Sequence, residues 1–329
     1  MNEKQKELVE QYDVTVESSY RSRGCLHLVT DKGLYMLTEY QGSPLRLAFE
    51  YELQKRLCEA GFDRVDLIMP NKEEGFIVYD KYRTPYIMKK AYNGTECNLK
   101  EEKDVRVACK NLAKFHQTVR LFSDYHVEKR ETKKVPEMLK ARAAGLKRIR
   151  GYIKKSGRKT AFELTFSSYY DQFYEEAVEA LKMAASYDQD FWRVGYGICH
   201  GAYHQHNVLI LEGETATLNM GQFHYNQQML DLYNMTRKAL EKNQYQKRIL
   251  EAALESYGEV LPLKKEDHDL LHLLFSFPEK FWKISNQYYN GKKCWMPAKN
   301  LEKLEKTIEQ NEQRRKLLME WNCNESSSV

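Results

Sequence analysis

The chain has 329 residues, enough for about two domains or for one unit with two lobes. Hydrophobic residues make up 42% of the chain and charged residues 30%, with only 16 Gly and 7 Pro, which excludes collagen-like and low-complexity proteins. No run approaches the roughly 18 consecutive apolar residues of a membrane span, and residues 1–12 lack the apolar core of a secretory signal. We therefore expect a globular cytoplasmic protein without a membrane span.

The net charge of +5 is unevenly distributed along the chain. Residues 129–159 hold thirteen Lys and Arg against two Glu, a local charge of +11, so the remainder of the chain sums to about −6. One interpretation is a docking surface for an acidic partner, and the other is a solvated helical hairpin whose long side chains cover apolar surface. No RNA-binding motif accompanies the run, so we do not expect nucleic acid as a partner. The candidate docking residues are Lys147, Arg148, Arg150, Lys154 and Lys155.

The first 92 residues predict a small β-rich lobe that contains one helix. Gly33 closes a turn between two strand-like runs, and Gly42-Ser43-Pro44 supplies a cap and a first helical position before apolar residues that recur every fourth position up to Gly61. The expected elements in chain order are strands at 25–30 and 34–40, a helix from 44 to 60, and strands at 75–82 and 85–92.

From residue 93 onward the apolar pattern is mainly helical, with stripes at 105–119, 162–187 and 301–321. The exception is a small hairpin in which two apolar runs flank Glu212-Gly213-Glu214. Residues 322–329 read as a frayed tail. The sequence thus predicts an α+β fold of two lobes, residues 1–92 and residues 93–329, the second carrying the basic insertion.

Residues 198–223 carry the most informative motif. A kinase catalytic loop has a His, the base Asp two residues later, and an Asn five residues after that Asp. His200 and Asn207 have this spacing, with Ala202 at the position of the Asp, and Asp231 opens a later helix.

These residues resemble the aminoglycoside phosphotransferase and choline kinase branch of the protein-kinase-like fold. Within it the run from His200 to Lys242 is most similar to the CotS family of spore coat proteins, and the resemblance covers residues 30–319. It implies a bilobal kinase-like fold, other coat proteins as partners, and a place in the mother-cell cytoplasm and the spore coat.

Against this family pattern, the groups that perform phosphoryl transfer are missing. No Asp or Glu lies between Gly201 and Leu211 to serve as base, a contribution of about 10²–10⁴ in rate. The magnesium ligand falls at Asn219, with Gly221 two residues on, and residues 215–230 contain no acid.

The phosphate-binding groups also depart from the pattern. Thr38 stands where family members place the phosphate-pairing Lys, so we expect its helical partner Glu50 to lack an ion pair. Gly24 is alone, without a glycine-rich loop.

We therefore predict a pseudokinase without cofactor or metal that binds other proteins. Three retained residues then have structural roles: His200 packs between the loop and the following turn, Asn207 binds the loop backbone, and Asp231 accepts loop N–H groups. The histidines 200, 204, 206 and 224 lack acids or Cys at ligand spacing for zinc, apart from Cys199. Two alternatives stay open, an active small-molecule kinase with displaced acids such as Glu212 or Asp231, and a polyanion-binding or RNA-binding module that uses residues 129–159.

Overall fold

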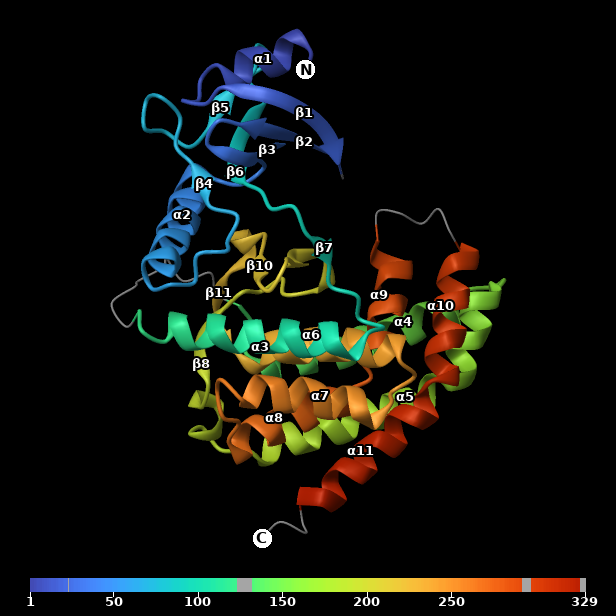
Figure 1. Cartoon of the computed structure of the whole chain (residues 1–329). Helices are drawn as coiled ribbons and strands as arrows, with labels where there is room; N and C mark the ends of the chain where they lie inside the picture. Colours follow the sequence, from blue (N-terminus) through green and yellow to red (C-terminus); the bar gives the residue numbers. More distant parts are fainter. Residues whose placement is uncertain (23, 123–131, 292–296, 326–329) are drawn as a thin grey trace.

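The computed structural model describes residues 1–22, 24–122, 132–291 and 297–325. The chain forms two lobes: a smaller β-sheet lobe carries the N-terminus, and a larger helical lobe carries the C-terminus (Figure 1). This is the two-lobed α+β fold that the sequence predicts.

The N-terminal lobe is one antiparallel sheet with strand order β1-β2-β3-β6-β4, and β5 pairs with β6. The turn between β2 and β3 has Gly33 at φ +115°, and the Ser43 side chain accepts the backbone N–H of Arg46 to begin α2. The elements are α1 (Glu3–Val9), β1 (Val16–Ser22), β2 (Cys25–Thr30), β3 (Gly33–Glu39), α2 (Pro44–Glu59), β4 (Ile68–Met69), β5 (Val78–Tyr79) and β6 (Pro85–Lys90).

Three parts of this lobe differ from the prediction. Helix α1 has only seven residues, and β1 is mostly exposed, so neither gives a clear apolar period in the sequence. The run at 75–82 contributes only the two residues of β5, because side-chain oxygens of Asn71 and Asp80 bind turn N–H groups on either side of it.

The C-terminal lobe is a helical core in which α3 packs against α7 and α4 packs against α5 and α9. The stripe predicted at 105–119 is buried on α3, as expected. Helix α11 runs to Glu325, so residues 322–325 are helical rather than frayed, and 326–329 lie outside the described residues. The helices are α3 (Glu102–Val119), α4 (Val135–Lys155), α5 (Ala161–Ser186), α6 (Met229–Lys242), α7 (Lys247–Gly258), α8 (Lys265–Ser276), α9 (Glu279–Asn290), α10 (Pro297–Glu309) and α11 (Asn311–Glu325).

Short strands flank the loop that contains Ala202, near the junction of the two lobes (Figure 1). The predicted hairpin around Gly213 is present as β9 and β10. Strand β7, at the start of the helical lobe, pairs with β9 of this hairpin. These elements are β7 (Thr95–Glu96), β8 (Tyr196–Cys199), β9 (Val208–Ile210), β10 (Thr215–Thr217) and β11 (His224–Gln227), with 3₁₀ turns η1 (Phe191–Arg193), η2 (Gln205–Asn207) and η3 (Met220–Gln222).

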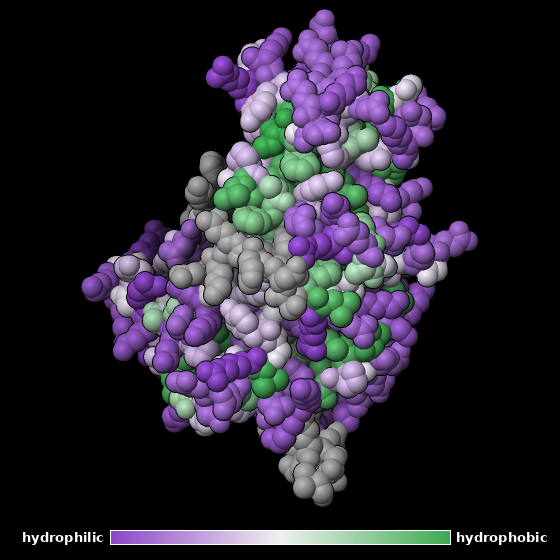
Figure 2. All heavy atoms as spheres, turned by 90° about the vertical axis from the view of Figure 1, so that its left-hand side faces the viewer, coloured by the Kyte–Doolittle hydropathy of each residue, from purple (hydrophilic) through white to green (hydrophobic). Residues whose placement is uncertain are grey.

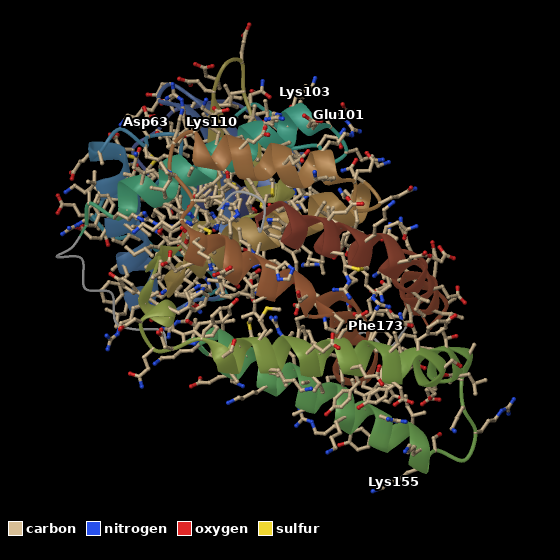
Figure 3. All side chains as sticks on the ribbon, turned by 90° about the horizontal axis from the view of Figure 1, so that it is seen from below. Asp63, Glu101, Lys103, Lys110, Lys155 and Phe173 are labelled. Atoms are coloured by element: carbon tan, nitrogen blue, oxygen red, sulfur yellow. The ribbon has the colours of Figure 1, made fainter. Side chains whose placement is uncertain are left out.

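The basic insertion is largely helix α4, which forms a protruding hairpin with α5 and has Lys155 near its tip (Figure 3). One face of α4 is apolar and buried, whereas Lys147, Arg148, Lys154 and Lys155 are exposed. Arg150 is not free: it pairs with Asp171 at 2.6 Å and lies over the ring of Tyr170. The helical-hairpin interpretation is therefore supported for residues 132–159, while 129–131 lie outside the described residues.

Among the helices that the structure describes, none combines the length and the apolar composition needed to cross a membrane. Hydrophobic side chains reach the surface near the junction of the lobes on the face shown in Figure 2, whereas the far end of the N-terminal lobe is hydrophilic.

Candidate functional site

A cleft of about 940 Å³ lies between the lobes. Its walls come from β2, β3, β6, the start of α2 and the loop segments around η2 and η3. Five of the residues singled out from the sequence line it together: Thr38, Glu50, Asn207, Asn219 and Gly221. The fold thus brings these five positions, which are far apart in the sequence, together in one cleft.

Glu50 has an ion-pair partner, contrary to the prediction. The ammonium of Lys89 lies 2.5 Å from Glu50 Oε1 and 3.2 Å from Asp66 Oδ2. Lys89 comes from β6, which pairs with β3 so that Lys89 stands opposite Met36, near Thr38. The missing cation of β3 is therefore supplied by the neighbouring strand.

The Glu50–Lys89–Asp66 triad is almost completely buried, with side-chain exposures of 3%, 8% and 1%. Burial raises the pKa of Glu50, and the charge of Lys89 offsets part of that effect. Burial opposes the charge on Lys89, yet Asp66 and Glu50 together raise its pKa. Two carboxylates share the ammonium of Lys89, so the charge of this lysine is already compensated within the protein.

Hydrogen bonds and packing contacts join helix α2 to η3 beside this triad. A Cβ at Gly221 would lie 2.9 Å from Glu50 Oε2, so glycine leaves the room that Glu50 occupies. Arg46 donates to the carbonyls of Gly221 and Phe223, and its guanidinium lies 4.0 Å from the centre of the Phe223 ring. These contacts hold Glu50 against Lys89.

The loop that carries Ala202 is held by the hydrogen bonds expected of the retained residues. His200 is fully buried, with Nε2 3.0 Å from the carbonyl of Leu218 and Nδ1 accepting the N–H of Ala202. Burial lowers the pKa of His200, as suits a neutral ring that donates from one nitrogen and accepts at the other. Asn207 donates to the carbonyl of Ala202 at 2.8 Å.

Asp231 anchors the same loop from below. Its carboxylate accepts the backbone N–H of His200 at 2.6 Å and that of Gly201 at 3.0 Å. His116 Nε2 lies 3.3 Å away, and its Nδ1 lies 2.8 Å from the hydroxyl of Tyr257. Burial alone would raise the pKa of Asp231, but the hydrogen bonds and the nearby histidines hold it below its usual value. Both carboxylate oxygens of Asp231 therefore already accept hydrogen bonds from the loop backbone.

The groups around Asn219 do not fit a magnesium ion. Asn219 has a left-handed backbone, φ 65°, and its N–H donates to Asp66 Oδ2, the same oxygen that Lys89 contacts. The amide oxygens of Asn207 and Asn219 are neutral ligands, and the two buried carboxylates of the cleft, Glu50 and Asp66, belong to the triad with Lys89, whereas Glu39 is exposed at the end of β3. Within the described ranges, no group of three His, Cys, Asp or Glu side chains could hold a metal ion.

Lys89 and Asp66 are the two site residues that sequence reasoning missed. Both interrupt apolar runs, Asp66 between Val65 and Leu67, and Lys89 two positions after Ile87 on the same face of β6. For Lys89 the available signal was a charged residue on the inward face of a strand, and for Asp66 it was a charged residue within an apolar run just before β4.

The family model described as "Spore coat putative kinase YutH" matches residues 5–321. The chain belongs to this family. The match confirms the resemblance to CotS-type spore coat proteins that the sequence motifs suggested, across almost the whole length of the chain. No curated protein sequence matches the chain.

Solved structures similar to this spore coat family member are phosphotransferases. An aminoglycoside phosphotransferase from Alicyclobacillus acidocaldarius superposes with a TM-score of 0.84 at 18% identity, covering 97% of this chain and 95% of that one. Spectinomycin phosphotransferase in complex with ADP and spectinomycin gives 0.67 at 12% identity, covering 94% and 97%. At these identities the likeness establishes the kinase-like fold.

Proposed function

We propose that this spore coat family member is a catalytically inactive kinase-like protein that acts as a binding component or scaffold of the coat. The observation that carries the proposal is the loop at Ala202. The position of the catalytic base holds a methyl group, and residues 202–211 contain no carboxylate. Without a base beside it, a substrate hydroxyl has no group to take its proton.

The two buried carboxylates of the cleft do not replace the missing acids. Glu50 and Asp66 are committed to Lys89, and Asp66 also accepts from Asn219 and from Gln54. A metal ion at this site would have to displace Lys89 from a buried ion pair, a change that typically costs several kcal/mol. This supports inactivity even though the cleft keeps both a cation and negative charge.

The displaced acids considered from the sequence are also badly placed for an active kinase. Glu212 is exposed at the tip of the β9–β10 hairpin and does not line the cleft. Asp231 is buried beneath the loop with its oxygens occupied. The positions of Glu212 and Asp231 therefore favour an inactive kinase-like protein over an active small-molecule kinase.

A thermal-shift measurement with ATP, with and without MgCl₂, tests the proposal. A structurally similar aminoglycoside phosphotransferase in the same buffer is the positive control. A magnesium-dependent complex at a hundred times its Kd would raise the unfolding midpoint by on the order of 5 °C. We expect no magnesium-dependent rise for this chain, and a rise equal to that of the control would overturn the proposal.

The place of action follows from the family and is part of the same proposal. We infer that the protein is made in the mother-cell cytoplasm and joins other coat proteins at the spore coat. Immunogold labelling of sporulating cells is expected to place it on the coat layers, and label confined to vegetative cells would contradict this inference.

A further inference from the structure

A group of cationic side chains lies on α6 and α9, beside the loop that carries Ala202. We call Arg237, Lys238, Lys280 and Lys283 the α6/α9 cation cluster. None of its members lines the cleft between the lobes. Lys242, one turn beyond Lys238, donates to Gln205 Oε1 at 2.7 Å, which joins this side of α6 to the loop.

The cluster contains more cations than acids. Glu241 pairs with both Arg237 and Lys280, the latter at 2.7 Å. Glu279, the other nearby acid, pairs with Arg142 of α4 at 2.6 Å. Lys238 and Lys283 have no hydrogen-bond or ion-pair partner in the part of the chain that the structure describes. Two unpaired ammonium groups therefore share one surface.

The position of Lys238 makes its unpaired charge costly. Lys238 is half-buried, and burial, followed by the charges of Arg237 and Lys283, lowers its pKa to about 8, with Glu241 offsetting part of the effect. Its field reaches the loop: burial and then the charge of Lys238 lower the pKa of His204 to about 4. An added negative charge would lower the free energy of this surface.

We propose that the α6/α9 cation cluster binds an acidic segment of a partner protein, with carboxylates paired to Lys238 and Lys283. The inference rests on the proposed binding function and names the chemistry of the partner. Outside residues 129–159 the chain carries about −6, so this excess of positive charge is local rather than general. Two unpaired lysines suit a short acidic segment, whereas nucleic acid binding uses an extended basic stripe with aromatic side chains.

The first test measures binding of a fluorescein-labelled peptide of ten glutamates to the full chain by anisotropy at low salt. The variant K238Q/K283Q is expected to bind the peptide at least about tenfold more weakly, because it lacks the two ammonium groups that would pair with the carboxylates of the peptide. The matched control K154Q/K155Q removes two exposed lysines of α4 and is expected to bind as the unchanged chain does. Equal affinity in all three proteins, or a loss confined to K154Q/K155Q, would overturn the proposal.

A second readout follows Lys238 itself. Acylation by acetic anhydride at pH 8, located by mass spectrometry, is expected to be slowed at Lys238 by the peptide, because an ion-paired ammonium keeps its proton. Unchanged labelling of Lys238 in the presence of saturating peptide would contradict the inference. Slower labelling of Lys238 in the presence of inorganic phosphate but not of the peptide would instead identify a phosphate ligand and overturn the proposed acidic segment.

The outcome is separable from that of the proposed function. ATP turnover by the unchanged chain would refute the inactive kinase whether or not the peptide binds. Absence of turnover together with absence of peptide binding would refute only the acidic partner.

Discussion

At the residue scale, Lys89 of β6 supplies the ammonium that β3 lacks, because β3 has Thr38 where related proteins place a lysine. Its ammonium is the shared counter-charge of Glu50 and Asp66, which lie 39 and 23 residues away along the chain. This contact depends on the β3–β6 pairing and on the packing of α2, and no local pattern contains that information. The cleft therefore contains a buried triad in which two carboxylates share one ammonium, and it is not a site without charge.

Replacement of Lys89 by Met is expected to cost about 3–5 kcal/mol of unfolding free energy, because it leaves two buried carboxylates without a cation. Urea denaturation at pH 7 measures the loss. Lys90→Met is the matched control, since Lys90 is the neighbouring, half-buried lysine of the same strand, and its effect is expected to stay below about 1 kcal/mol.

The pH dependence separates charge from packing in this variant. Burial raises the pKa of Glu50, and without Lys89 no ammonium offsets that effect, so Glu50 takes up a proton above its ordinary pKa and the loss for Lys89→Met shrinks as the pH falls from 7 to 5. A loss that is the same at both pH values would show that packing alone is responsible.

Lys238 has the opposite effect on stability. Its folded pKa of about 8 lies below the ordinary lysine value of 10.5, so the unfolded state binds more protons between these values and stability due to this group rises with pH across the window. Lys238→Gln is expected to stabilise the protein by roughly 0.5–2 kcal/mol at pH 7. The gain should disappear near pH 10.5, as thermal unfolding of both proteins can show, and a gain that persists there would contradict the assigned cause.

At the scale of elements, the loop that carries Ala202 is fixed by a close backbone approach at Gly201. Gly201 and Gly213 both have φ +77°, so an alanine suffers the same left-handed strain at each. A Cβ at Gly201 would lie 2.2 Å from the carbonyl oxygen of Gln222, whereas one at Gly213 meets nothing within 4 Å. The pair separates backbone strain from steric conflict.

Gly213→Ala is expected to cost about 1–2 kcal/mol, and Gly201→Ala at least about 2 kcal/mol more. Denaturant unfolding of the two variants gives the difference directly. Equal losses of unfolding free energy in the two variants would mean that the loop can move away from η3. The close backbone approach at Gly201 would then not fix the loop.

The longer helices with a clear apolar period were predictable, as on α3, where the stripe from Val105 to Val119 is buried as expected, whereas α1 and the individual helices between α5 and α10 were not predicted one by one. Strand β1 was not, since most of its side chains are exposed and its register is set by β2. The loop at His200 was predictable from its spacing, and the bonds of His200, Asn207 and Asp231 follow that expectation. Lys89 and Asp66 required the tertiary fold.

At the scale of the whole molecule, the hairpin of α4 and α5 and the α6/α9 cation cluster are both basic, and the cluster contains Lys238, a half-buried lysine without a hydrogen-bond or ion-pair partner among the described residues. The hairpin of α4 and α5 has exposed basic residues toward its protruding end, where Lys155 lies (Figure 3), although Arg150 is already paired. The α6/α9 cation cluster lies beside the loop instead. Under the two proposals, the partner site would lie next to the loop that carries Ala202 in a kinase-like fold.

The most direct test of the central claim is ADP formation by the purified full-length chain with Mg·ATP. Amino and hydroxyl compounds serve as acceptors, and a structurally similar aminoglycoside phosphotransferase runs in parallel. We predict that the rate equals that of a reaction without protein under conditions in which the control turns over. Magnesium-dependent ADP formation that scales with the concentration of this chain and is lost in Asp66→Asn would contradict the account.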